Sequence, residues 1–98
     1  MVYKITYHPL AAKELDDAYL YYDAQQKGLG LTFVQAIKAT EKRIAHFPVA
    51  WQPLSPNSRR ALVSRFPYGV IYHIVQESIT IIAIAHLHRK PFFWKGHL

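Results

Sequence analysis

Residues 68–86, YGVIYHIVQESITIIAIAH, decide the fold of this chain. Residues 68–76 are rich in β-branched and aromatic side chains, which favour a half-buried strand. Residues 77–78 can form a tight turn, and residues 79–86 are apolar on both faces. A strand without alternation is typical of the centre of a sheet that is covered on both sides. This stretch therefore predicts a hairpin at the centre of a small sheet.

The rest of the chain adds a strand, two helices and a further strand. Residues 2–8 alternate between apolar and polar side chains, as a strand with one buried face does. Pro9 suits the first turn of a helix, and Pro48 ends a second helix with an apolar stripe. Gly28 and Gly30 are expected to break the pattern between the helices. The remaining segments are expected to be a loop with three prolines at 48–58, a strand at 60–65 and a bend at 66–67.

The expected order is β-α-α-β-β-β in a single domain of residues 1–98. Two helices packed on one face of a small, mainly antiparallel sheet form an α+β domain. A chain of 98 residues can bury one modest core. The position of the first strand in the sheet is left open, because no sequence pattern assigns it a neighbour.

Charge is unevenly distributed along the chain. Residues 1–37 hold three basic and four acidic residues, whereas residues 38–98 hold nine basic and two acidic ones, and the net charge is +6. This asymmetry indicates an anionic partner, either a nucleic acid, an enzyme that acts on one, or an acidic protein. The alternative is a basic surface that serves solubility alone. The lack of cysteine excludes disulfides and thiolate metal sites. With no leader-like start and no apolar run of about 18 residues, we expect a cytoplasmic protein.

The central strand ends in a cluster of cations, His86, His88, Arg89 and Lys90, within AIAHLHRKPFFW at residues 83–94. Arg89 is the favoured residue, because a guanidinium can hold a phosphate or carboxylate through two parallel hydrogen bonds. A salt bridge to an acidic side chain is the alternative. His86 is either part of this basic site or a core-edge histidine. His86 and His88 share a face, but no third ligand follows, so neither metal nor cofactor is expected.

Further residues are candidates for contact with a partner. Arg60 and Arg65 differ by five positions and point to opposite faces of a regular strand, so they are not expected to form one site. Phe93 and Trp94 either anchor a partner, as aromatic residues do at interface hot spots, or fold back into the core. The acidic residues of the first helix are expected on its outer side or near its start: Glu14, Asp16, Asp17 and Asp23.

RRALVSRFPYGVIYHI at residues 59–74, followed by ITIIAIAHLHRKPFFW at residues 79–94, resembles the RelE/ParE superfamily of bacterial toxins, often called plasmid stabilisation proteins. The most specific parts are FPY at 66–68 and His86 with Arg89 and Pro91. The resemblance implies the toxin of a type II toxin–antitoxin module, held inactive by a small antitoxin. RelE-like members of the superfamily cut mRNA in the ribosomal A site, whereas ParE-like members bind DNA gyrase.

The cations that RelE-like toxins use for cleavage are only partly present. With the chains aligned through the tyrosine of FPY, basic positions of the family are retained at Arg60 and Arg89. Two other basic positions of the family fall on Leu62 and Gly69, and a C-terminal tyrosine of the family falls near Trp94 and Lys95. Loss of one donor that stabilises transition-state charge typically lowers a rate by about 10²–10³-fold. The pattern therefore favours a ParE-like toxin.

We expect a non-enzymatic inhibitor of DNA gyrase that is neutralised by a cognate antitoxin and has no membrane partner; a homodimer is left open. The alternative is a RelE-like, metal-independent endonuclease that acts on mRNA at the ribosome, with a site of Arg60, His86, His88 and Arg89. A third hypothesis is a degenerate module that only binds its antitoxin. The expected partner-binding residues are Arg60, Arg65, His86, Arg89, Lys90, Phe93 and Trp94.

Overall fold

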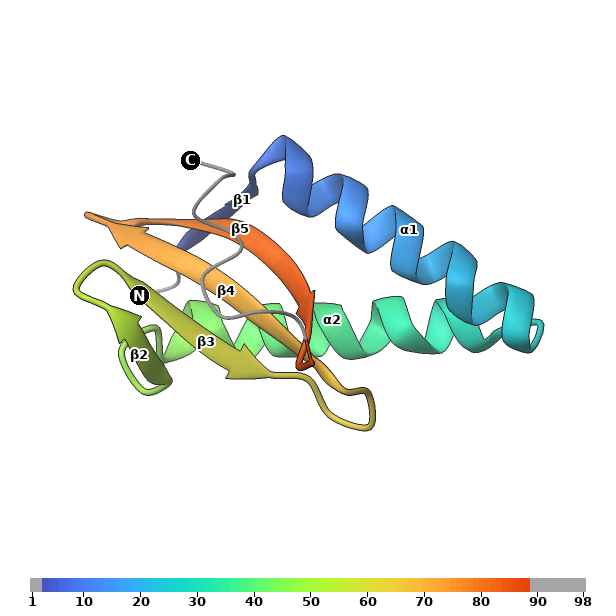
Figure 1. Ribbon diagram of the computed structural model, residues 1–98. Helices are drawn as coiled ribbons and strands as arrows, with labels where there is room; N and C mark the ends of the chain where they lie inside the picture. Colours follow the sequence, from blue (N-terminus) through green and yellow to red (C-terminus); the bar gives the residue numbers. More distant parts are fainter. Residues whose placement is uncertain (1–2, 89–98) are drawn as a thin grey trace.

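The computed structural model describes residues 3–88 of the chain. Within these residues the chain forms two helices and five strands (Figure 1). Neither of these helices is both long and apolar enough to cross a membrane. The elements are, in chain order, β1 (Lys4–Tyr7), α1 (Pro9–Gln25), α2 (Leu29–His46), β2 (Gln52–Ser55), β3 (Ser58–Leu62), β4 (Tyr68–Val75) and β5 (Ser78–His86).

The strands form one sheet in the order β1-β5-β4-β3-β2. β1 runs parallel to β5, and every other neighbouring pair is antiparallel. Both helices pack on the same face of this sheet (Figure 1). The predicted α+β class and the central hairpin of β4 and β5 are therefore confirmed. The sequence left the position of the first strand in the sheet open. The structure places this strand, β1, at the edge of the sheet beside β5.

Some predicted segments differ from the structure. The expected loop at 48–58 contains an additional strand, β2, although it includes Pro53. A proline is tolerated there because β2 is an edge strand, whose outward N–H groups need no partner strand. The strand predicted at 60–65 was placed too late, since β3 ends before Arg65, which has a φ of 72°. The turn between β4 and β5 lies one residue earlier than expected, at 76–77.

The two helices form a closely packed hairpin. Pro9 lies in the first turn of α1 as predicted, and His8 caps this helix by accepting a backbone N–H at Nδ1. Gly28 adopts a φ of 93° between the helices, which favours glycine. Gly30 lies inside α2, so the expectation that it breaks the helix was wrong. A Cβ on Gly30 would stand 2.7 Å from the carbonyl oxygen of Tyr19, so glycine allows α1 and α2 to approach.

An aromatic cluster joins the helices to the sheet. The ring of Phe33 on α2 lies 5.0–5.1 Å, between centroids, from the rings of Tyr22, Phe66 and Tyr68. Phe66 belongs to the bend between β3 and β4, where the sequence predicted a bend. The FPY segment is therefore fixed by the core, and it positions the adjoining end of the sheet.

β5 is buried on both faces, as its apolar sequence predicted. Ile79, Ile81 and Ile84 pack toward the helices. On the other face, Ala83 and Ala85 belong to a second buried cluster with Ile71 and Ile82. We call this second side the helix-free face of the sheet.

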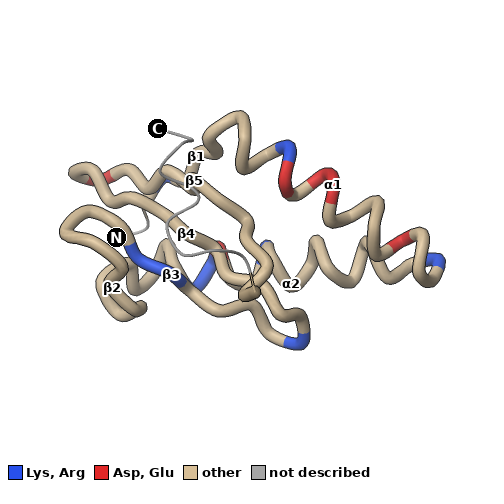
Figure 2. The backbone as a smooth tube through the Cα atoms, viewed as in Figure 1, with Lys and Arg blue, Asp and Glu red and all other residues tan. Residues whose placement is uncertain are grey.

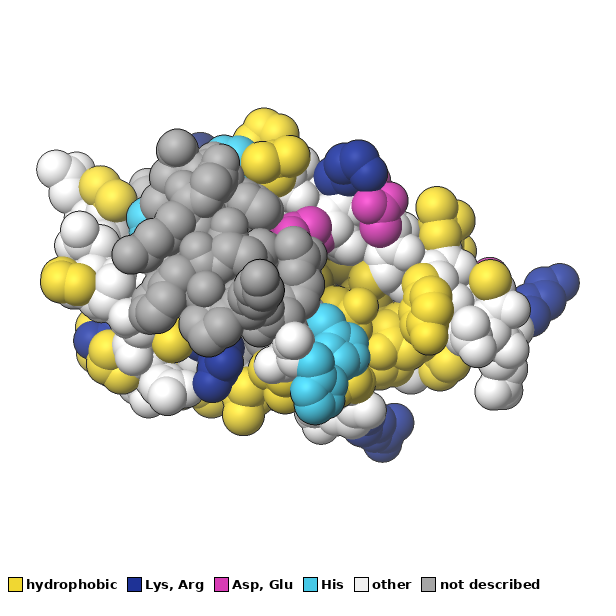
Figure 3. All heavy atoms as spheres, viewed as in Figure 1, with side chains coloured by type: hydrophobic (Ala, Val, Ile, Leu, Met, Phe, Trp, Pro, Cys, Tyr) yellow, Lys and Arg dark blue, Asp and Glu magenta, His cyan; other side chains and the backbone are white. Residues whose placement is uncertain are grey.

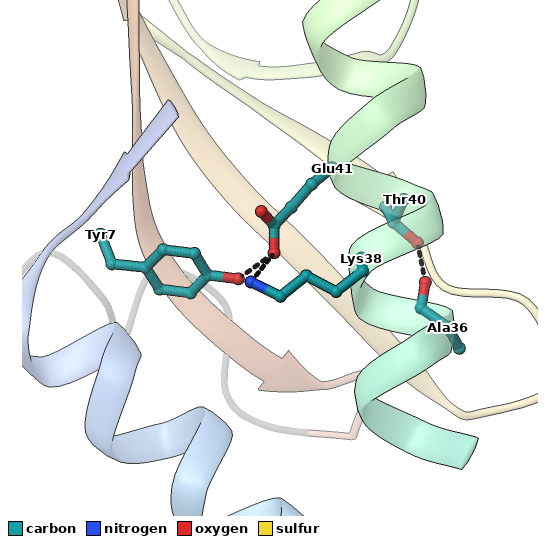
Figure 4. Close-up of polar contacts among 5 residues, drawn as sticks. All are labelled: Tyr7, Ala36, Lys38, Thr40 and Glu41. Carbon is teal, nitrogen blue, oxygen red and sulfur yellow. Dashed lines mark hydrogen bonds and ion pairs between the residues drawn. The ribbon is translucent and has the colours of Figure 1, made fainter. Parts of the chain in front are cut away.

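β1 is attached to α2 by a polar cluster (Figure 4). The Tyr7 hydroxyl donates to Glu41 Oε2 at 2.5 Å, and Lys38 Nζ lies 3.5 Å from the same oxygen. The Lys38 ammonium also lies 5.7 Å from the centroid of the Tyr7 ring. Burial, together with the Glu41 carboxylate, raises the pKa of Tyr7. Nearby, the Thr40 hydroxyl donates to the carbonyl of Ala36. The short edge strand is therefore fastened to the helical layer.

Candidate interaction site

Arg60 and His86, which the sequence analysis assigned to one surface, point to opposite faces of the sheet. Arg60 is the cross-strand partner of Ile71, which lies in the cluster on the helix-free face. His86 is paired with Tyr68, which packs against the core under the helices. The two basic side chains therefore do not converge on one ligand.

A β-bulge explains why His86 faces the helices. Along β5, Ile79 and Ile81 face the core, and strict alternation would place His86 on the helix-free face. The register between β4 and β5 shifts by one residue at Ile71/Tyr72, which leaves Ile82 as the extra residue. Beyond the bulge, even-numbered residues face the helices. A bulge of this kind re-aims the side chains that follow it.

Arg60 is held in place on the helix-free face. Its Cγ and Cδ lie over Gly69, where a Cβ would stand 2.9 Å from either atom. Its Nη2 donates to Gln52 Oε1 at 2.9 Å, while its buried Nε has no hydrogen-bond partner among the described residues. No carboxylate among residues 3–88 forms an ion pair with Arg60. Arg60 is thus a positioned cation with no compensating acidic side chain in the described part of the chain.

The neighbouring arginines have other roles. Arg59 Nη1 donates to the backbone carbonyls of Val49 and Trp51, at 3.1 and 2.8 Å, and so attaches the segment before β2 to the sheet. Arg65 is exposed in the bend between β3 and β4, rather than on a strand. Arg60 and Arg65 are therefore separate, as the sequence predicted, although the reason is the end of the strand and not alternation along it.

His86 and His88 form a pair at the end of β5. Their ring centroids are 5.0 Å apart, and the backbone N–H of His88 donates to His86 Nδ1 at 3.1 Å. The Leu87 N–H donates to the Pro67 carbonyl at 2.9 Å, which joins this turn to the FPY bend. In residues 3–88 no three His, Asp or Glu side chains are grouped closely enough to hold a metal ion.

A groove of about 290 Å³ lies between α1 and the end of β5. We call it the α1–β5 groove; α1 contributes Glu14, Asp17 and Tyr21, and the sheet contributes Tyr68, Ile84 and His86. In Figure 3, histidine side chains at the lower centre adjoin a hydrophobic surface that runs toward α1, with acidic side chains above it. The sequence analysis placed these acidic residues on the outer side of the helix or near its start and did not identify the groove, because the packing of α1 against β5 is a tertiary feature.

Glu14 closes part of the β5 edge inside this groove. β1 pairs only with residues 78–81 of β5, and the His8 N–H bonded to the Ile81 carbonyl ends that pairing. Beyond it, the Ile84 N–H points away from β4 and donates to Glu14 Oε1 at 3.0 Å. A side-chain carboxylate therefore takes the place that a neighbouring strand would occupy.

His73 was not singled out from the sequence, yet it lies on the same face as Arg60. Its cross-strand partners are Ser58 on β3 and Thr80 on β5. Burial lowers the pKa of His73, which favours the neutral imidazole. His73 lies two residues after Ile71 on β4, so the two side chains share a face of the sheet. The sequence alone did not show which face Ile71 occupies, and so it could not place His73.

The basic character of the chain is divided between described and undescribed residues. Residues 3–88 carry nine basic and six acidic residues, and Figure 2 shows acidic positions gathered along α1. Lysine provides the cation of both ion pairs found there, Lys13–Asp17 and Lys38–Glu41. The other predicted partner-binding residues lie outside the described residues: Arg89, Lys90, Phe93 and Trp94.

A family model described as the ParE toxin of the type II toxin–antitoxin system parDE matches residues 5–91. The chain belongs to the ParE toxin family. Its similarity to Toxin ParE2 of Mycobacterium tuberculosis agrees: 29% identity over 92 residues, which cover 93% of this chain and 88% of the relative, in both strain CDC 1551 / Oshkosh and strain H37Rv. The resemblance drawn from the sequence, on its ParE-like side, is therefore confirmed.

A solved structure supports the fold of this ParE family member. A chain from a structure described as the chromosomal ParDE TA system of P. aeruginosa has a TM-score of 0.75 to this chain at 21% identity. The match covers 87% of this chain and 96% of the other. Membership in the family identifies the protein as a type II toxin and implies an antitoxin as its partner.

Proposed function

We propose that this ParE-type toxin acts in the cytoplasm by binding and inhibiting DNA gyrase, without catalysis, and that a cognate antitoxin neutralises it. The observation that carries this proposal is the isolated position of Arg60. Its stem occupies the space above Gly69, and within the described residues no second cation lies beside it on the helix-free face. A single positioned guanidinium suits the binding of an anionic surface.

RNA cleavage needs groups that converge on one phosphate. A base must reach the ribose hydroxyl while cations stabilise the charge that develops in the transition state. Arg60 and His86 lie on opposite faces of the sheet, which argues against the endonuclease alternative. Among residues 3–88, the imidazole on the face of Arg60 is that of His73, and no hydrogen bond joins these two side chains. The geometry therefore supports binding more than cleavage.

We assign the target-binding surface to the basic residues of the helix-free face and of the end of the sheet. Arg60 is the described member of this surface on the face itself, and Arg65 lies toward the end of the sheet at which β3 ends and β4 begins. His86 faces the helices instead and is not part of this surface. The assignment extends to the residues that follow β5, namely Arg89, Lys90, Phe93 and Trp94. Gyrase handles DNA and offers anionic surfaces that such cations can contact.

Supercoiling by purified gyrase, in the presence of the toxin, tests the proposal. Wild-type toxin is expected to inhibit the reaction. Arg60→Gln is expected to weaken inhibition by about tenfold, as loss of a charged hydrogen-bonding group does, and Arg60→Lys to retain part of it. Lys42→Gln, which removes one exposed cation from α2, is the matched control and should inhibit like wild type.

Two further assays separate the alternatives. Supercoiling that is unaffected by wild-type toxin, together with cleavage of mRNA on ribosomes, would establish the endonuclease instead. Normal growth on expression without antitoxin would favour a module that only binds its antitoxin.

A further inference from the structure

We propose that Gln52, on the edge strand β2, is a positioning residue that holds the Arg60 guanidinium in its target-binding orientation. This inference deepens the proposed function, because it rests on Arg60 as the cation that contacts the target. It also gives a role to β2, the strand that the sequence analysis did not predict. In this role Gln52 acts through Arg60 and makes no contact of its own with the target.

The first step of the argument is the placement of Gln52 beside Arg60. β2 lies at the edge of the sheet next to β3 (Figure 1), and the two residues are direct cross-strand partners. Directly opposed residues of antiparallel strands share a face, so both side chains lie on the helix-free face. Gln52 Oε1 accepts the hydrogen bond from Arg60 Nη2 at 2.9 Å. A neutral acceptor therefore orients the guanidinium without cancelling its charge.

The second step is the way in which Gln52 is itself held. β2 pairs with β3 alone, so its position depends on attachments outside the sheet. Arg59 and Tyr72 lie on the side of the sheet that faces the helices. Arg59 Nη1 donates to two backbone carbonyls of the segment that precedes β2, and the Tyr72 hydroxyl donates to a third, at 2.6–3.1 Å. These bonds fix the segment that leads into β2, so Gln52 meets Arg60 in a defined register.

The third step is the state of the guanidinium that results. The Arg60 stem rests over Gly69, and its buried Nε has no hydrogen-bond partner among the described residues. The bond to Gln52 uses Nη2, and no residue within 3–88 accepts a hydrogen bond from Nη1. The N–H groups of Nη1 are therefore left for an anionic group of the target. A side chain that is already ordered loses less conformational freedom on binding, so Gln52 raises affinity through preorganisation.

Gyrase supercoiling with variants of Gln52 tests this inference. Gln52→Met has a similar length but no amide acceptor, and it is expected to weaken inhibition by about three- to tenfold, the effect of one hydrogen bond. Gln52→Glu keeps an acceptor and adds a charge that pairs with the guanidinium. It is expected to weaken inhibition by about tenfold or more, because the neutralised cation no longer attracts an anionic surface. Gln35→Glu, at an exposed position of α2, is the matched control and should inhibit like wild type.

The two variants at residue 52 separate positioning from a purely structural role. A structural role predicts that Gln52→Glu preserves inhibition, because the link between β2 and β3 is retained. Positioning predicts that inhibition falls while the midpoint of urea denaturation stays equal or rises. In an Arg60→Gln background, Gln52→Met should weaken inhibition no further, since its effect passes through one guanidinium. Inhibition equal to wild type by either variant, or an undiminished loss in the Arg60→Gln background, would overturn the inference.

Two measurements without gyrase distinguish failure of this inference from failure of the proposed target. Growth arrest on expression without antitoxin reports toxicity whatever the target is, and both variants at residue 52 should weaken it while Gln35→Glu should not. Hydrogen exchange of the Arg60 Nε–H, followed by NMR, reports the order of the side chain itself and should be several-fold faster in Gln52→Met.

The outcomes then separate cleanly. If wild-type toxin does not inhibit gyrase, faster exchange and weaker growth arrest in Gln52→Met would support the inference, whereas gyrase as the target would be abandoned. Exchange of the Arg60 Nε–H that is the same in Gln52→Met and wild type would overturn the inference whatever the result with gyrase.

Discussion

The side chain of Arg60 lies against the backbone of Gly69, and a Cβ on residue 69 would stand 2.9 Å from both Cγ and Cδ of the arginine. Cβ atoms in proteins essentially never approach this closely. The lack of a side chain on β4 therefore determines the path of a cation on β3.

Gly69→Ala is expected to move the Arg60 guanidinium away from Gln52 and to weaken target inhibition by about three- to tenfold, the effect of one hydrogen bond. Stability should change by less than about 1 kcal/mol, because the arginine stem is flexible and alanine suits a strand better than glycine. The measurements are gyrase supercoiling and urea denaturation. In a double-mutant cycle with Arg60→Gln the two effects should not add, since both act on one guanidinium. Simple additivity would refute the coupling.

Gly30→Ala is expected to destabilise the protein by about 1–3 kcal/mol, in the range for overpacking of a close contact. The new Cβ would meet the backbone carbonyl of Tyr19 at 2.7 Å, so α1 and α2 would have to separate. Urea denaturation measures the change. Helix propensity alone predicts the opposite effect of Gly30→Ala, an increase of about 1 kcal/mol in the free energy of unfolding. Gln35→Ala, at an exposed position of the same helix, is the control and should be neutral or slightly stabilising.

Much of the fold could be predicted from residue patterns that are local. The apolar run of β5, the helical spacing of α1 and α2, and the FPY bend each reflect local propensity or burial. Pro53 concealed β2, because proline excludes a central strand but not an edge strand. The position of Gly30 inside α2 was also not predicted, because the reason for a glycine there is tertiary. Its role depends on the approach of Tyr19, which no pattern within α2 can indicate.

The candidate site could be predicted only in part, because its geometry depends on register. Arg60 and His86 were recognised by residue type, but the bulge at Ile71/Tyr72 turns His86 to the other face. A shift of one residue changes the face of every residue that follows it. The bond from Ile84 to Glu14 joins residues 70 positions apart, and it was equally beyond the reach of spacing arguments.

Tyr72→Phe is expected to cost about 1–3 kcal/mol of stability at neutral pH. The Tyr72 hydroxyl donates to the buried Pro48 carbonyl at 2.6 Å, and the substitution leaves that acceptor without its donor. Chemical denaturation measures the loss. Tyr21→Phe is the control, because Tyr21 is exposed and the change should be nearly neutral.

The stabilising contribution of the Tyr72 hydroxyl is also expected to depend on pH in the alkaline range. Burial raises the pKa of Tyr72 to about 12, with Arg59 acting in the opposite direction. A folded-state pKa above the unfolded value near 10 means that the native protein holds the proton more tightly. The contribution of Tyr72 is therefore complete below pH of about 10 and is lost as the pH rises toward 12. The difference in stability between wild type and Tyr72→Phe should shrink over this range, whereas a constant difference would contradict the assignment.

His73 is expected to make the protein less stable in mild acid. Burial lowers the pKa of His73, so between its folded value and the unfolded value near 6.5 the unfolded chain binds more protons. The free energy of unfolding should therefore fall as the pH drops below about 6.5. His73→Gln should remove this part of the pH dependence, and denaturation at about pH 7.5 and pH 5 measures it. His46→Gln, at an exposed histidine on α2, should retain the wild-type slope. An unchanged slope in His73→Gln would show that the acid sensitivity arises from another group.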